Sequence, residues 1–190
     1  MDWRATRYEL LTSSPVSPLA LKVVTHPGVY AWWDLDGALS TLWPAAFPPV
    51  DTSMPLYVGI AQKQSLAARV GEMHLANTRR SGLRRSLAPL LSQSYDLMRG
   101  AVRHPRGGKF GLEHEQEVAL TTWMLANLRM TWVAHDNSGR VEKAMILDLT
   151  PPLNDVHAAG SPYRVQMRAL RADFRTSAPL VYVPKTSRSL

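Results

Sequence analysis

The sequence predicts a small α/β or α+β domain of about three strands with helices packed on them, and three observations lead to this prediction. The chain has 190 residues, 45% of them hydrophobic, which suffices for one domain with a buried core. Short runs of β-branched and aromatic residues are interspersed with longer segments typical of helices. Proline-rich segments at 12–19 and 44–55 must be loops. The expected order is strand, strand, helix, helix, helix, strand, helix.

Three short runs predict the strands. Residues 29–33 and 130–134 combine β-branched and aromatic side chains, and turn residues follow each run. Residues 55–61 form the remaining strand, which ends at a polar Gln-Lys-Gln segment. Two strands are therefore expected near the start of the domain and one much later.

Good helix formers and helically spaced apolar residues predict the helices. Ser65 is a suitable N-cap for the first, and Pro89 is expected to kink or divide the second. Residues 105–111 are rich in glycine and basic residues, so we expect a loop there. The predicted helices cover 66–75, 83–98, 113–128, 141–149 and about 161–174.

The composition excludes several classes of protein. The absence of cysteine rules out a disulfide-stapled scaffold, a zinc ribbon, an iron–sulfur site and a cysteine nucleophile. No apolar run reaches the 18 residues that would indicate a membrane span. Residues 1–9 lack the basic-then-apolar order of a signal peptide. We therefore expect a soluble, cytoplasmic protein.

The positive charge is concentrated in two segments. The formal net charge is +7, and residues 64–110 alone carry nine basic and two acidic side chains. Residues 161–190 carry six basic and one acidic side chain, after an acidic stretch at 111–160. Clustered basic residues favour a polyanionic partner, because they release counterions from a phosphate backbone. An ordinary basic surface explains the charge alone equally well.

Five scattered residues could together handle a phosphodiester. Tyr30 and Tyr57 lie on the first two predicted strands, each close to a glycine that would let a ligand approach the backbone. Arg69 lies on the helix that follows, Glu142 lies in a short helix, and Asn154 follows Pro-Pro-Leu. Packing, solvent exposure, a favourable helix charge or a turn would explain each residue separately. Only the joint pattern points to a site.

That joint pattern resembles the GIY-YIG nuclease family. Residues 28–30 (Gly-Val-Tyr) and 57–59 (Tyr-Val-Gly) resemble its two signature triplets. Arg69, Glu142 and the Pro-Pro-Leu-Asn element at 151–154 match the remaining motifs in order. The interval of 27 positions between the two tyrosines is longer than the tight hairpin usual in the family.

The resemblance implies a small three-stranded, mostly antiparallel sheet flanked by helices, with a helical insertion and a basic C-terminal helix. A nuclease domain is then expected over 27–155, with insertions at about 34–54 and 76–135. Residues 1–26 would be an N-terminal extension, and 156–190 a basic C-terminal helix and tail.

The resemblance also implies hydrolysis of DNA with Mg²⁺ or Mn²⁺. Glu142 would supply one hard oxygen to the metal, and Arg69 would offer its planar guanidinium to phosphate oxygens. Tyr30 would orient or deprotonate the attacking water, and Tyr57 and Asn154 would position phosphate and neighbouring side chains. This activity is that of a metal-dependent endonuclease.

His74 lies five residues after Arg69, where a histidine is common in restriction-type members of the family. Five residues of an α-helix correspond to about 140° of rotation, so His74 is expected to share the Arg69 face only partly. The ordinary pKa of a tyrosine near 10 is high for a base, which makes His74 the natural substitute for Tyr30.

Basic residues outside the motifs are candidate nucleic-acid contacts, with the basic tail helix holding phosphates across the cleft. They are Arg79, Arg80, Arg84, Arg85, Arg103, Arg106 and Lys109. Two alternatives remain open: a non-cleaving nucleic-acid-binding protein whose first loop separates the two tyrosines, and an enzyme acting on a small anionic substrate. A homodimer would suit symmetric cutting. The acidic residues at 113–117 are interpreted as a helix start and not as a metal cluster.

Overall fold

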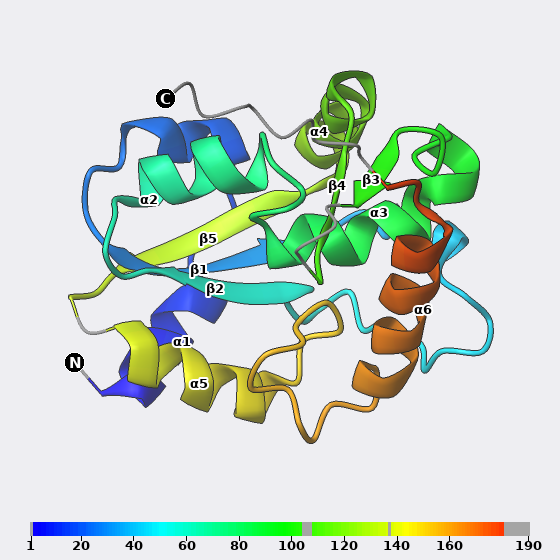
Figure 1. Cartoon of the computed structure of the whole chain (residues 1–190). Helices are drawn as coiled ribbons and strands as arrows, with labels where there is room; N and C mark the ends of the chain where they lie inside the picture. Colours follow the sequence, from blue (N-terminus) through cyan, green and yellow to red (C-terminus); the bar gives the residue numbers. More distant parts are fainter. Residues whose placement is uncertain (1, 104–107, 137, 181–190) are drawn as a thin grey trace, which may run out of the picture.

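The structure is a computed structural model that describes residues 2–103, 108–136 and 138–180. A three-stranded sheet lies at its centre, with helices on both faces and a two-stranded hairpin beside it (Figure 1). The sheet contains β1 (Gly28–Trp33), β2 (Tyr57–Ala61) and β5 (Arg129–Ala134). Both pairings are antiparallel, in the order β2-β1-β5. The fold class predicted from the sequence is therefore confirmed.

Six α-helices surround the sheet in the described part of the chain, together with two 3₁₀-helices and one π-helix. The α-helices are α1 (Trp3–Thr12), α2 (Leu66–Ala68), α3 (Gly82–Tyr95), α4 (His114–Asn127), α5 (Ser138–Leu149) and α6 (Arg164–Ser177). The others are the 3₁₀-helices η1 (Pro18–Val23) and η2 (Ser40–Leu42) and the π-helix η3 (Arg69–His74). Within the described residues, no helix is both long and apolar enough to cross a bilayer.

The alternation of β1 divides the core into two layers. Tyr30 and Trp32 face the larger layer, which also contains the buried leucines of α3. Val29 and Ala31 face the smaller layer, under α1 and α5. The antiparallel register places Tyr30 opposite Gly59, so the two signature triplets share the face of the larger layer.

The long segment between β1 and β2 leaves their pairing intact. The buried carboxylate of Asp34 accepts hydrogen bonds from the backbone N–H groups of Ala38 and Leu39, each at 2.8 Å, and so turns the chain directly after β1. Farther along, Trp43 Nε1 donates to the carbonyl of Pro48 at 2.8 Å. The two tyrosine-bearing strands are therefore neighbours, as the sequence predicted.

The hairpin and α3 are among the elements that differ from the sequence prediction. Residues 105–111 were expected to be a loop, but Phe110 and Gly111 lie in β4 (Phe110–Leu112), which pairs with β3 (Ala101–Arg103). The Phe110 ring packs 4.7 Å from that of Phe174 on α6, and this long-range contact holds the hairpin. In α3 the helix continues past Pro89 without division, because its leucine face is buried along the whole helix.

Both outer edges of the sheet carry other parts of the chain. Beside β5, Val16 exchanges two backbone hydrogen bonds of 2.8 Å with Met130. Beside β2, the Leu153 N–H donates to the carbonyl of Leu56 at 3.0 Å. The segment after α5 thus runs along the free side of β2, where it delivers Asn154.

Candidate active site

The phenol of Tyr30 occupies a space that only glycine leaves free. Tyr30 is fully buried, and a Cβ built on Gly59 would lie 2.5 Å from its phenol oxygen. A Cβ on Gly28 would similarly lie 2.4 Å from the carbonyl oxygen of Val133. The expectation that these glycines admit a ligand is therefore wrong, because protein groups fill both spaces.

The Tyr30 hydroxyl is hydrogen-bonded to two other candidate site residues, Arg69 and His74. Arg69 Nε donates a hydrogen bond to it at 3.1 Å, and Nε2 of His74 is hydrogen-bonded to it at 2.6 Å. The other ring nitrogen of His74, Nδ1, lies 2.7 Å from the hydroxyl of Ser81. The same Ser81 oxygen accepts a hydrogen bond from the backbone N–H of Arg84 and caps α3. A continuous series of hydrogen bonds therefore links Arg69 through Tyr30, His74 and Ser81 to the start of α3.

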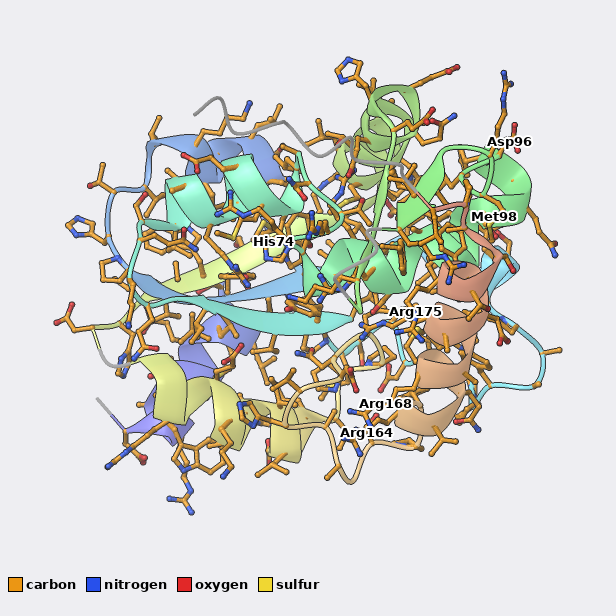
Figure 2. The ribbon with its side chains drawn as sticks, viewed as in Figure 1. His74, Asp96, Met98, Arg164, Arg168 and Arg175 are labelled. Carbon is orange, nitrogen blue, oxygen red and sulfur yellow. The ribbon has the colours of Figure 1, made fainter. Side chains whose placement is uncertain are left out.

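A π-helix brings Arg69 and His74 together. Residues 66–75 were expected to form one regular helix, but the chain changes to the π form at Arg69. The Leu75 N–H bonds to the carbonyl of Val70, five residues back, at 2.9 Å. This wider turn brings residues five apart closer to one face, which corrects the expectation of only partial overlap. Figure 2 shows His74 beneath this segment, facing the sheet.

Tyr57 also packs edge-on against the His74 ring. The Tyr57 and His74 ring centroids are 5.8 Å apart, with the rings at 69°. A Cβ on Gly82, the first residue of α3, would lie 3.2 Å from the Tyr57 oxygen. The Tyr57 phenol therefore lies against the start of α3.

Burial keeps the phenols and the imidazole uncharged at neutral pH. It raises the pKa of Tyr30 above its ordinary value of 10.0, although the Arg69 cation opposes the rise. Burial also raises the pKa of Tyr57 and lowers the pKa of His74 well below 6.5. Arg69 is then the charged member of the Tyr30 hydrogen-bonded group.

Glu142 is a carboxylate whose charge is poorly compensated. Burial raises its pKa from 4.5 to about 7, and the Arg69 cation opposes this rise only in part. The charge of Glu142 also contributes to the raised pKa values of Tyr30 and Tyr57, so the carboxylate lies within electrostatic range of both phenols. Within the described ranges, no group of three or more histidine, aspartate or glutamate side chains could hold a metal ion. Any metal here would have Glu142 as its main protein ligand.

Asn154 holds the edge of β2. Its Oδ1 accepts from the Val58 N–H at 2.9 Å, and its Nδ2 donates to the Val58 carbonyl at 2.8 Å. Val58 is the central residue of the second triplet, and Asn154 is only 4% exposed. Both the oxygen and the nitrogen of the Asn154 amide thus bond to the backbone of β2, which supports its expected role in positioning neighbouring groups. Asn154 positions Tyr57 through the strand.

The structure also corrects the expectation for Arg84. It was a candidate nucleic-acid contact, yet its side chain is fully buried and pairs with Glu117 at 2.6 Å. It also donates to the carbonyl of His74 at 3.0 Å and to the hydroxyl of Thr121 at 2.9 Å. Glu117 in turn accepts from the N–H of Thr78 at 2.8 Å. Arg84 therefore supports the π-helix from inside the protein.

The other basic candidates lie at or near the surface, apart from one outside the described residues. Arg79, Arg80 and Lys109 are exposed, whereas Arg85 is half-buried and donates to the Arg79 carbonyl at 2.7 Å. Arg103, on β3, is also half-buried. Arg106 falls outside the described residues.

The sequence interpretation missed Ser81 and Arg171. Arg171 donates to the carbonyls of Gly82 and Leu153, at 3.2 and 3.1 Å, and so ties α6 to the site. A signal for it was present, because Arg171 lies four residues after Met167 and three before Phe174, which are the two buried apolar residues of α6. Nothing in the spacing of Ser81 indicated its contact with the histidine.

Comparison with known proteins agrees with this geometry. The sequence model described as the GIY-YIG catalytic domain matches residues 28–173, which include both tyrosines and extend into α6. No significant match was found among curated proteins or among solved structures. The matched region is well over half of the chain, and it begins and ends with elements that build the site. The chain thus belongs to the GIY-YIG family, whose catalytic domain is a nuclease domain.

Proposed function

We propose that the protein is an endonuclease that hydrolyses DNA phosphodiester bonds with the help of Mg²⁺ or Mn²⁺. The observation that carries this proposal is the contact of Tyr30 with both Arg69 and His74, next to the poorly compensated Glu142. A cytoplasmic location and a homodimer remain predictions.

The chemistry of Glu142 fits a hard divalent cation. Mg²⁺ takes few protein ligands and keeps water and substrate phosphate oxygens around it, so one carboxylate suffices. A half-buried carboxylate with a raised pKa gains most from a nearby cation, since the cation favours its ionised form. When bound, the metal would stabilise negative charge on the phosphate and leaving oxygens.

In this proposal Arg69 binds the phosphate that is cut. Its Nε is occupied by Tyr30, and one terminal nitrogen contacts the sulfur of Met73 at 2.7 Å. The side chain also lines an open pocket of about 580 Å³ together with Arg79 and Arg80. Its remaining N–H groups can therefore reach a phosphate oxygen while Nε holds the tyrosine.

Tyr30 and His74 together provide a path for the proton of the attacking water. We infer that the Tyr30 oxygen takes this proton and passes its own to Nε2 of His74. This transfer requires the tautomer in which Nδ1 carries the proton and donates to Ser81. A phenol with a raised pKa would not act alone as a base, whereas a neutral histidine 2.6 Å away can accept its proton.

The two alternatives fit the molecule less well. Separation of the tyrosines by the first loop was the reason to expect a non-cleaving protein, but both rings contact His74. A small anionic substrate would favour an enclosed cavity, whereas the pocket beside Arg69 is open and rimmed by arginines.

The proposal is tested by nicking of supercoiled plasmid with Mg²⁺ and with a chelator. We expect nicking with Mg²⁺ only, and its loss in Glu142→Ala with DNA binding retained. Absence of nicking by the wild-type protein in Mg²⁺ and Mn²⁺, with DNA binding intact, would favour the non-cleaving alternative. If the protein shows neither nicking nor salt-sensitive DNA binding, the small-substrate alternative gains.

A further inference from the structure

A second basic pocket, which we call the α6 pocket, lies between α6, β4 and the first turns of α3. Its volume is about 400 Å³. Figure 2 shows three α6 arginines, Arg164, Arg168 and Arg175, along the helix that borders it. The charged side chains that line it are Arg85, Lys109, Arg168, Arg171 and Arg175, with Asp155 as the single acidic one.

Asp155 cannot neutralise this pocket. Its carboxylate is shared by Arg168, by Arg171 at 3.4 Å and by Arg164 at 3.7 Å. Arg175 has no carboxylate partner within the described residues and donates instead to the carbonyl of Gly108 at 3.2 Å. Five cations facing one carboxylate leave a strong positive excess, which favours an anion with several charges.

Arg171 forms the floor of the pocket. Its side chain is only 13% exposed, and its Nε has no hydrogen-bond partner in the described part of the chain. Burial lowers its pKa to about 10, so it remains charged at neutral pH. A buried, incompletely paired guanidinium is stabilised by an anion that enters the pocket.

The pocket adjoins the pocket beside Arg69. Lys109 lines both this pocket and the one that contains Arg69. Arg85, which lines the α6 pocket, is bonded to the backbone of Arg79, which lines the Arg69 pocket. A strand can therefore follow these cations from one pocket to the other.

We propose that the α6 pocket is a backbone-phosphate subsite that holds the substrate strand on one side of the bond cut at Arg69. This inference rests on the proposed function, since it assigns the path of the same substrate. Recognition in this subsite would be by charge and by the fit of guanidinium groups to phosphate oxygens. The subsite adds affinity without sequence preference.

The test removes one arginine from the pocket and one from elsewhere. Arg175→Ala lies at the α6 pocket, and Arg4→Ala is a matched control on α1, where the side chain is 75% exposed. Binding of a fluorescent duplex is measured by anisotropy in chelator over a range of salt. For Arg175→Ala we expect about tenfold weaker binding at low salt and a salt slope smaller by about one. Arg4→Ala and Arg175→Lys should keep the wild-type slope.

Thermal melting checks that the variants are folded. Arg175 is half-buried and bonds to one backbone carbonyl, so its loss should leave the melting temperature nearly unchanged. If the wild type cleaves and Arg175→Ala binds with the affinity and slope of Arg4→Ala, the subsite is wrong and the nuclease assignment stands. If the wild type binds DNA but never cleaves, the nuclease assignment fails, while a reduced slope in Arg175→Ala still supports the pocket as a phosphate site.

Discussion

Gly59 and Tyr30 are cross-strand partners, and the Tyr30 phenol lies over the glycine where any larger residue would place its side chain. Because the phenol lies close over the glycine, its hydroxyl can bond to both Arg69 and His74. The glycine at the end of the second signature triplet is thus required by a tyrosine in the first. The two triplets form one unit across the β1–β2 pair.

The first prediction concerns that glycine. Gly59→Ala would place a Cβ 2.5 Å from the Tyr30 oxygen, so the phenol must move away from His74. We expect a loss of at least about a hundredfold in cleavage rate, given the usual contribution of a positioned proton acceptor. Gly71→Ala is the matched control, since its Cβ would meet no atom within 4 Å. Equal rates in the two variants would contradict the assigned role of Tyr30.

The second prediction separates Arg84 from its neighbour. Arg84→Ala leaves the Glu117 carboxylate and the His74 carbonyl without their buried partner, which should cost about 3–5 kcal/mol in the free energy of unfolding. Arg85→Ala should cost far less, because the Arg85 side chain is only half-buried and bonds to one backbone carbonyl. Urea unfolding of both variants measures the difference. A similar small loss in both would show that Arg84 has no structural role.

The third prediction concerns Asn154. Asn154→Ala leaves the buried N–H and carbonyl of Val58 unpaired, which we expect to lower the free energy of unfolding by about 2–3 kcal/mol. Cleavage should also fall, because β2 no longer holds Tyr57 in place, while the affinity for DNA stays close to that of the wild type. A large loss of DNA affinity in a folded variant would instead indicate direct contact of Asn154 with phosphate.

The fourth prediction is the pH dependence of Glu142. The pKa of Glu142 is raised from 4.5 to about 7 in the folded protein. The free energy of unfolding should therefore fall as the pH rises through that range and the buried carboxyl group ionises. Glu142→Gln should therefore match the wild type near pH 4 and exceed it at pH 8 by on the order of 2 kcal/mol. Thermal or urea unfolding of both proteins at the two pH values checks the sign. Without metal, a wild type more stable than the variant at pH 8 would contradict the burial of this carboxylate.

The raised pKa of Glu142 also predicts that the affinity of the protein for a metal ion depends on pH. A cation binds the ionised form, so Mg²⁺ affinity should increase between pH 6 and 8, with release of protons at neutral pH. Calorimetry in buffers of different ionisation heat measures the number of protons released. Unchanged affinity over this range would mean that Glu142 is not the ligand.

The sequence could predict those parts of the site that follow from local pattern. Strands rich in aromatic and β-branched residues, such as 29–33, indicated β1 and its partner, and the expectation was that Tyr30 and Tyr57 could share one face if these strands paired. The observed register places them there. The same applies to the longer helices, whose bounds differ from the prediction by only a few residues. The strands and the longer helices could be predicted because both produce a periodic pattern of apolar residues that is visible in the sequence itself.

Other features depend on contacts that no local pattern encodes. The π-helix at 69–74 changes which residues share a face, and regular helical geometry misplaces His74. Arg84 belongs to a run of exposed basic residues in the sequence, yet Glu117, 33 residues later, draws it into the core. The β3–β4 hairpin was missed because its stability comes from α6, through the contact of Phe110 with Phe174.

The strip of chain from Leu153 to Asn154 also protects the molecule from self-association through its sheet. An uncovered outer strand exposes N–H and C=O groups on which a strand from a second copy can assemble, and this is a common start of aggregation. Here the Val58 groups are already bonded to an amide side chain, and Val16 fills part of the opposite border. Asn154, which holds the strand that carries Tyr57, would thus also hinder cross-β pairing at this edge.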